Sequence, residues 1–478
     1  MSAAGDMPFI VSTGNPDEKS GVSERKFIRR HVMIGKNRGK VFPNRKKPVK
    51  NPDSEQSVAR EEAKKLRIHP RSVVCESPRR VGGELSCVAL GDSIDTSLVE
   101  TVIQFANFAK TAMFPLEPCI NLPKKDVTWL EPMLGDAAHL HTMIFTTHSF
   151  FDMIRFDMPR PIDQSGSPHY AKAMKLLRER IAGENTDDIL KKSTLSVIIS
   201  LAMHSLLQGD HEAARYHVLG LKRIVELRGG LRPLMSHSPN LLMELLRMDI
   251  ALAVHANRSP VFFQDTAQDP PWPYPKEVMV QGPIESFAAQ SSITWPGSQF
   301  DGLDPDVARA WRALEVFTSQ LNNALRTKTK LLKESFLETI VSTMYRLLAM
   351  RFPMGSLSEM VRQALLAYGY ATFIHWSNHI RPIGGTSYPA TYGQCITRFE
   401  QAGGSPRIIL WALLIGVNAI FIEEDMGWLD PLLKSHIDLY GHGTFEGTKI
   451  LLHGFMWIDF LHDRSLKRVF ARLYPDTV

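Results

Sequence analysis

The stretch Ala213–Leu231, AARYHVLGLKRIVELRGGL, decides the fold. Its apolar residues recur every three or four positions, which is the spacing of one face of an α-helix. The face that this spacing buries consists of Ala214, Val218, Leu221 and Val225. Gly229-Gly230 then supplies the left-handed conformation in which many helices end. We therefore expect an amphipathic helix over 213–228 with one face against a core.

The same periodicity extends outward in both directions. A Ser97-x-x-Glu100 capping box predicts the start of a helix, and Pro239 opens another. Further helices are expected at 129–155, 169–182, 187–208, 241–256, 306–327, 335–350, 357–375, 391–402 and 408–421, with a final pair ending near residue 473. Because no segment shows convincing strand alternation between hairpin turns, we predict an all-α fold, a large domain of antiparallel helices.

The composition is that of a globular protein with a sizeable core. The chain has 478 residues, of which 44% are hydrophobic and 22% charged. These values exclude disorder throughout, collagen and a disulfide-stapled miniprotein. The four cysteines, Cys75, Cys87, Cys119 and Cys395, include no C-x-x-C pair. Their spacing excludes a zinc finger or zinc cluster of the usual kind and indicates a reducing compartment.

We expect neither a secretion signal nor a membrane span. The apolar patch at 7–11 lacks a basic flank and is too short for a signal. The longest apolar run, 408–422, would cover as a helix only about 22 Å of a hydrocarbon core of about 30 Å. We predict a buried core helix there and no membrane partner.

Positive charge is concentrated at the N-terminus. Residues 1–80 contain 19 Lys and Arg against 9 Asp and Glu, whereas residues 81–478 contain 37 against 41. The stretch 25–50 has 11 cationic residues and no acidic one. With few aromatics and many Pro, Gly, Ser and Asn, this arm cannot bury enough apolar surface to fold alone. We predict a disordered basic arm over 1–90 and a helical domain over 91–478.

The region 260–305 differs from the rest of the chain in its high proline content. It has eight prolines in 46 residues, and no helix of ordinary length fits between most of them. We expect a long surface insertion or a linker between two lobes.

Three interpretations of the arm stay open. Its basic clusters at 29–30 and 45–47 are separated by 14 residues, which suits a bipartite signal read by a nuclear import receptor. The same cations suit contacts with DNA phosphates, whose released counterions make the affinity depend on salt. A solvated tail without a fixed partner is the third interpretation. The candidate contact residues are Arg29, Arg30, Lys36, Arg38, Lys40, Arg45, Lys46 and Lys47.

Patterns typical of catalysis or metal binding are weak. Asp187-Asp188 begins an aspartate-rich motif such as terpene synthases use, but Lys191 stands where the third carboxylate belongs and would repel Mg²⁺. His139 and His141 lie two apart and would point to different faces of a helix. We therefore predict no cofactor, no metal site and no enzymatic activity.

Several segments carry a family resemblance. The clearest is His217-Val218-Leu219-Gly220-Leu221 followed by Arg228-Gly229-Gly230-Leu231. Together these look like the "H..GL" and "RGGL" core of the fungal-specific transcription factor domain. Other similar segments are Trp129-Leu130-Glu131-Pro132, His169-Tyr170, Leu410–Gly416, Phe455–Asp459 and, in the arm, Arg29-Arg30-His31-Val32-Met33. The resemblance spans about residues 95–475.

The resemblance implies a transcriptional regulator of a filamentous fungus that acts in the nucleus and controls a secondary-metabolite gene cluster. Its implied partners are DNA, a DNA-binding transcription factor, or both. The family's usual DNA reader holds two zinc ions with six cysteines, and four scattered cysteines exclude that mode here. DNA contact would then fall to the basic arm, because a net-acidic body does not attract duplex DNA. The alternatives are a nuclear co-regulator or scaffold that binds no DNA and, less favoured, a helical enzyme.

Folding alone also explains the motif residues His217, Gly220, Leu221, Arg228, Gly229 and Gly230. Leu221 is expected in the core, and Gly220 is expected to permit the close approach of another helix. Arg228 is placed to cap carbonyls at the end of its own helix, where the helix dipole favours a cation. Effector or partner binding is the alternative for this motif.

Overall fold

The computed structural model describes residues 90–113, 116, 119–121, 133, 135–156, 168–183, 185–264, 270–276, 300–374, 387–422 and 425–475. The chain divides between Ile68 and His69, and all described residues belong to the second part. The eight candidate contact cations of the arm lie outside the described residues.

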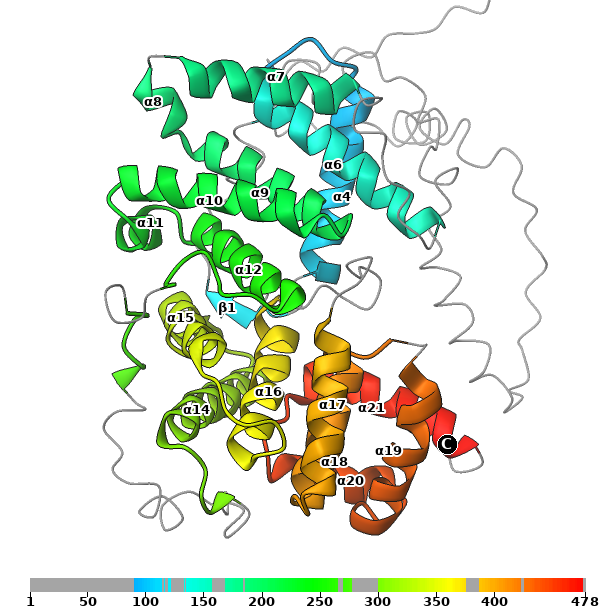
Figure 1. Ribbon diagram of the computed structural model, residues 1–478. Helices are drawn as coiled ribbons and strands as arrows, with labels where there is room; N and C mark the ends of the chain where they lie inside the picture. Colours follow the sequence, from blue (N-terminus) through cyan, green and yellow to red (C-terminus); the bar gives the residue numbers. More distant parts are fainter. Residues whose placement is uncertain are drawn as a thin grey trace, which may run out of the picture. The chain divides into compact units, whose positions relative to one another are not determined.

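The described residues form an all-α domain, as the sequence predicts (Figure 1). The first group of helices is α4 (Thr96–Met113), α6 (Ala137–Phe156), α7 (Pro168–Ala182), α8 (Thr186–Ile189), α9 (Lys192–Leu207), α10 (His211–Leu227), α11 (Leu231–His237) and α12 (Pro239–Ala256). The second group is α14 (Pro305–Thr327), α15 (Lys333–Ala349), α16 (Leu357–Gly369), the π-helical turn η4 (Tyr370–Ile374), α17 (Tyr388–Gln401), α18 (Pro406–Ala419), α19 (Met426–Tyr440), α20 (Phe445–His453) and α21 (Asp459–Leu473).

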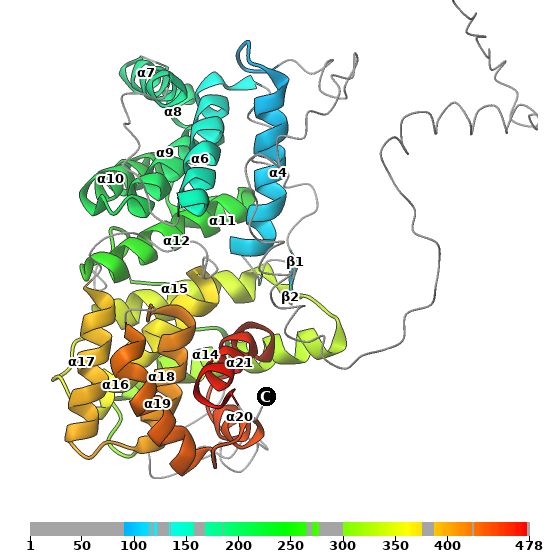
Figure 2. The same ribbon diagram turned by 90° about the vertical axis from the view of Figure 1, so that its right-hand side faces the viewer.

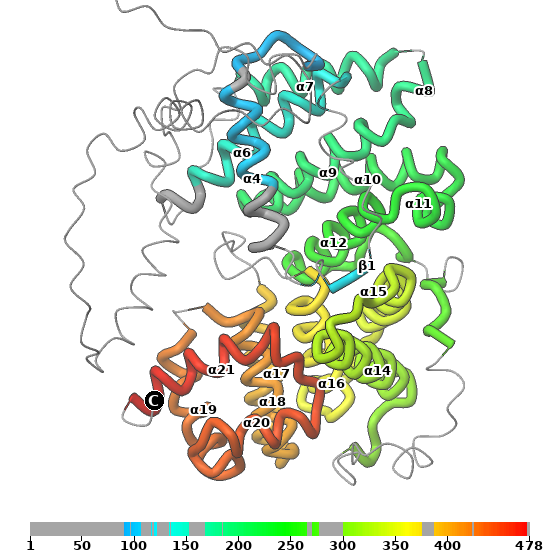
Figure 3. The backbone as a smooth tube through the Cα atoms, turned by 180° about the vertical axis from the view of Figure 1, so that it is seen from behind, coloured from blue at the N-terminus to red at the C-terminus, as the bar shows by residue number. Residues whose placement is uncertain are grey.

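The two groups meet where α12 packs against α15 (Figures 1 and 2). Seen from behind, α4 to α12 again lie together on one side of this boundary and α14 to α21 on the other (Figure 3). One hydrophobic cluster runs through both groups, so they share a core. The only strands among the described residues are β1 (Ile120–Asn121) and β2 (Leu331–Leu332), which pair in parallel. This short pairing joins the two groups and was not predicted.

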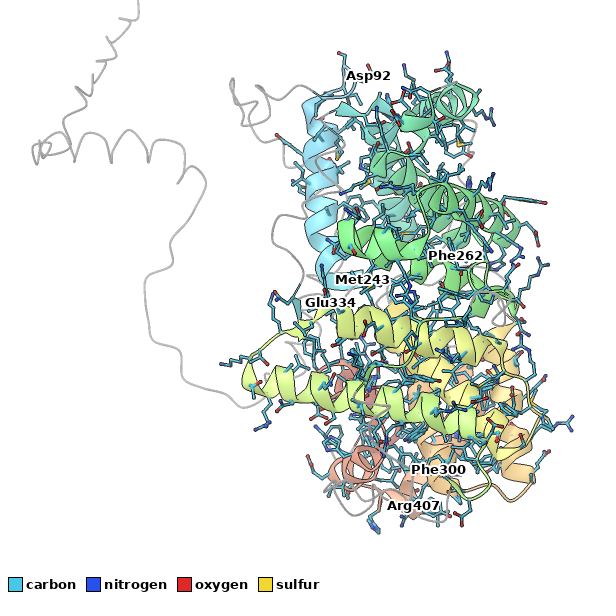
Figure 4. All side chains as sticks on the ribbon, turned by 90° about the vertical axis from the view of Figure 1, so that its left-hand side faces the viewer. Asp92, Met243, Phe262, Phe300, Glu334 and Arg407 are labelled. Carbon is cyan, nitrogen blue, oxygen red and sulfur yellow. The ribbon has the colours of Figure 1, made fainter. Side chains whose placement is uncertain are left out.

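A buried carboxylate organises the boundary from the α12 side. Asp249 is fully buried and accepts hydrogen bonds from the backbone N–H groups of Val261 and Phe262, at 2.6 and 2.9 Å. The Tyr345 hydroxyl on α15 donates a third, at 3.0 Å. In Figure 4, Met243 marks α12, Glu334 marks the start of α15, and Phe262 marks the segment that follows α12. The carboxylate therefore holds that segment and α15 against α12.

Three local predictions are wrong at helix ends. The capping box is not formed, because the helix begins at Thr96 and the Asp95 carboxylate accepts from the Ser97 N–H at 3.0 Å. The expected helix over 187–208 is broken into α8 and α9. At the break, Thr194 Oγ1 donates to Asp188 O at 2.8 Å, so a side chain replaces a helical N–H. The expected final pair is three helices, α19, α20 and α21.

The proline-rich region contributes to the core where it is described. Val261, Phe263 and Trp272 are buried, and Arg346 of α15 donates to the Trp272 carbonyl at 2.8 Å. These parts are therefore packed against the domain, whereas a surface insertion or linker was expected; 265–269 and 277–299 lie outside the described residues.

The apolar run near residue 410 forms α18, which is buried from Ile408 to Gly416, so the predicted core helix is confirmed. Within the described part of the chain, no helix combines the length and apolar character needed to cross a membrane.

Candidate functional site

The family-like motif occupies the corner between α10 and α11. Asp210 caps α10 by accepting from the Ala213 N–H at 2.9 Å, so the helix starts two residues before the predicted position. At the other end Gly229 and Gly230 have φ of +90° and +95°. The Gly230 N–H donates to Val225 O at 2.9 Å, which closes the helix end. The predicted stop is confirmed, and α11 follows it directly.

The inner face of α10 is core. Leu221 and Val225 are buried, and α10 packs against α9 and α12. His217 is half-buried, and the loss of solvent lowers its pKa. These residues support the predicted structural account of Leu221 and give His217 an inward-facing position.

Gly220 does not permit close helix approach, and that prediction is wrong. The residue is exposed, and a Cβ built there would meet nothing within 4 Å. Close approach occurs instead at Gly369 of α16, where a Cβ would collide with the Met344 sulfur of α15. Periodicity places Gly220 on the edge of the apolar stripe, but the helices that pack against α10, α9 and α12, do not reach this exposed position.

Arg228 caps a different helix from the one predicted. Its Nη1 donates to Leu190 O, the carbonyl at the end of α8, at 2.8 Å. Partial burial lowers the pKa of its guanidinium. Two acidic residues close in sequence to these groups pair with other cations, Asp188 with Lys191 and Glu226 with Arg223. Arg228 thus links the break between α8 and α9 to the end of α10.

A pocket of about 170 Å³ opens at this corner. It is lined by Val225, Arg228, Gly230, Pro233, Leu234 and His237. His237 Nδ1 lies 2.7 Å from Pro233 O, and Lys192 Nζ donates to His237 O at 3.2 Å. The chain reversal at the two glycines therefore brings a guanidinium, an imidazole and three apolar side chains around one hollow.

No protein-family model, curated protein or solved structure matches this chain.

The structure brings only part of the predicted motif to the pocket. Arg228 and Gly230 line it, whereas His217 and Gly220 do not. Sequence reasoning missed Pro233, Leu234 and His237, which belong to α11, a helix that was not predicted. The signal was weak because α11 has only seven residues and too short an apolar stripe to recognise.

Within the part of the chain that the structure describes, the other histidines and aspartates of interest form pairwise contacts and no metal site. His141 Nε2 lies 3.1 Å from Asp92 Oδ2 and His141 Nδ1 lies 2.8 Å from His169 Nδ1, which ties the segment before α4 to α6 and α7. Asp188 pairs with Lys191 at the end of α8. Among the described residues, no group of three or more His, Cys, Asp or Glu side chains is arranged to hold a metal ion.

Proposed function

We propose that the protein is a nuclear transcriptional regulator that contacts DNA through its basic arm. The observation that carries this proposal is the separation of charge: 11 cations and no acid in residues 25–50, against 37 cations and 41 acids in residues 81–478. A polycationic arm joined to a net-acidic body would bind phosphates with the arm while the body stays off the duplex. The resemblance of the α10–α11 motif to the fungal-specific domain extends the proposal to control of a secondary-metabolite gene cluster in a filamentous fungus.

The proposal predicts how steeply the DNA affinity falls as the salt concentration rises. Each phosphate contact contributes about −0.9 to the slope of log affinity against log salt concentration. If all eight candidate cations contact phosphates, we expect a slope of up to about −7. A slope this steep corresponds to a loss of about four powers of ten in affinity between 50 and 200 mM salt.

The test compares two variants that lose the same charge. The first replaces the eight candidate cations with Gln. The second, a matched control, replaces the eight cations of residues 1–80 that lie outside 25–50, which are Lys19, Arg60, Lys64, Lys65, Arg67, Arg71, Arg79 and Arg80. DNA affinity is measured by fluorescence anisotropy across a salt titration, on random duplexes and on duplexes selected from them.

We expect the first variant to lose most of the affinity and of the salt slope, and the control to lose less than tenfold. Equal losses would show that only total charge matters, which contradicts a defined contact segment. Absence of binding by the unaltered chain at low salt would refute direct DNA contact.

A specific feature favours a second candidate, a co-regulator that binds protein partners and no DNA. The outer face of α10 carries Tyr216, Leu219 and Leu227, which are 71, 40 and 52% exposed. Three large apolar side chains on one exposed helix face suit a protein partner. This candidate becomes the better one if the unaltered chain binds no DNA while its arm still directs nuclear import.

A further inference from the structure

We propose that the pocket between α10 and α11 binds a small organic carboxylate, with Arg228 as the group that receives the carboxylate. This binding site goes beyond the proposed function and does not depend on DNA binding. The proposal rests on three features of the pocket: an incompletely used guanidinium, apolar walls and limited volume.

The guanidinium of Arg228 has hydrogen-bonding capacity left over. It offers five N–H donors, and within the described residues the structure gives it one hydrogen bond, to Leu190 O, and no ion pair. The side chain is half-buried, and partial loss of solvent lowers the pKa of its guanidinium, so a counter-charge beside it would stabilise the charged form. A carboxylate in the pocket would supply the charge and accept two parallel N–H bonds.

The apolar walls of the pocket determine which kind of ligand body fits beside the carboxylate. Val225, Pro233 and Leu234 line the pocket with hydrocarbon, which suits an apolar body and disfavours a strongly hydrated dianion such as phosphate. The volume of about 170 Å³ is below the range of about 300–1,000 Å³ that is common for drug-sized ligands. The ligand class is therefore a short aliphatic or single-ring monocarboxylic acid.

The backbone keeps the pocket open. Gly230 lines it, and a Cβ built at this residue would meet nothing within 4 Å. Its positive φ of +95° disfavours residues with side chains, so no side chain from this position fills the hollow. Access for a ligand thus follows from the same glycine that ends α10.

The test uses two pairs of probes of nearly equal shape on the full chain: benzoate against benzamide, and butanoate against butanamide. Binding is followed by titration of the methyl NMR signals of Val225 and Leu234. We expect each carboxylate to bind at least ten times more tightly than its amide, with shifts centred on these two residues. Equal affinities within the pairs, or no carboxylate binding, would overturn the proposal.

Two variants locate the charge that matters. Arg228→Gln should abolish the preference for carboxylate, whereas Arg223→Gln should preserve it. The control is matched because Arg223 lies on the same helix, exposed and paired with Glu226. A preference that survives Arg228→Gln would also overturn the proposal. Should that variant fail to fold, the probe pairs on the unaltered chain decide the question.

Discussion

Helices α10 and α12 pack against each other but differ in how much of their surface is buried. On α12, Arg247, Asp249 and His255 are all buried. On α10 only one face is buried, and the opposite face offers exposed apolar residues and an open glycine. The contrast separates two tasks: α12 holds the two groups of helices together, and α10 with α11 presents a surface and a pocket.

The buried polar groups of α12 have partners far away in the sequence. Arg247 Nε donates to Phe373 O at 2.8 Å, and His255 Nε2 lies 2.7 Å from the Tyr370 hydroxyl. Both partners belong to η4. Because a buried polar group without its partner costs the full penalty of lost hydration, these contacts make α12 intolerant of change.

The largest effect is expected for Asp249→Ala. The change leaves two backbone N–H groups and the Tyr345 hydroxyl without their acceptor. At about 1–3 kcal/mol for each buried unsatisfied group, and with partial relaxation, we expect a loss of about 3–5 kcal/mol in the free energy of unfolding. Urea unfolding followed by circular dichroism measures it. Asp306→Ala, an exposed carboxylate in the first turn of α14, is the control and should cost less than about 1 kcal/mol; equal costs would contradict the special role of α12.

The pH dependence of the free energy of unfolding tests whether polar side chains of α12 and its neighbours are buried as described. Loss of solvent lowers the pKa of His255 to about 3 and that of His204 on α9 to about 4. Between these values and the ordinary 6.5, the unfolded chain takes up protons that the folded chain does not. Stability that is present above pH 6.5 is therefore lost as the pH falls, by about 1.4 kcal/mol per pH unit for each histidine.

Asp249 opposes this trend. Burial raises the pKa of its carboxyl to about 6, so the folded chain takes up this proton before the unfolded chain does, and the contribution of Asp249 increases as the pH falls from 6 to 4. Summing the three groups, we expect a net loss of about 3–4 kcal/mol between pH 6.5 and 4. Urea unfolding across this range measures the slope, and His255→Gln should flatten it by about 1.4 kcal/mol per pH unit. An unchanged slope in that variant would show that His255 is not the group responsible.

A smaller effect is expected at the pocket. Arg228→Gln removes the donor to Leu190 O, and we expect a cost of about 1–2 kcal/mol, because this carbonyl can turn to water at a half-exposed site. Arg223→Gln, which removes only an exposed ion pair, should change the free energy of unfolding by less than about 0.5 kcal/mol. If Arg228→Gln costs as much as Asp249→Ala, the contrast between the two helices does not hold.

The smallest effect has the opposite sign. Gly220→Ala adds a methyl group in open space within a helix, and the better helix propensity should raise stability by about 0.5–1 kcal/mol. Gly369→Ala is the matched comparison, because its methyl group would meet the Met344 sulfur; we expect it to destabilise by about 1–3 kcal/mol. Thermal unfolding of both variants distinguishes them, and a destabilising Gly220→Ala would mean that α10 has a neighbour on its outer face.

Much of the fold could be predicted because apolar periodicity is local. The spacing of Val218, Leu221 and Val225 and the stop at Gly229 gave α10 and its buried face. The break at Leu190 could not be predicted, since the side chain that donates a hydrogen bond to its carbonyl, Arg228, lies 38 residues later. Residues of α11 such as Leu234 were missed because a single pair of helical turns has too few apolar positions to show a period.

The sequence by itself determined the all-α class, the main helices and the concentration of cations in the arm, because each follows from neighbours in the chain or from composition. Only the tertiary structure decided that Asp249 joins α12 to α15, that Gly220 faces open space, and that Arg228 lines a pocket while it caps α8. The physical reason is that hydrogen-bond partners and packing neighbours are chosen by proximity in space, and residues 96 positions apart, as Asp249 and Tyr345 are, leave no trace of that proximity in local spacing.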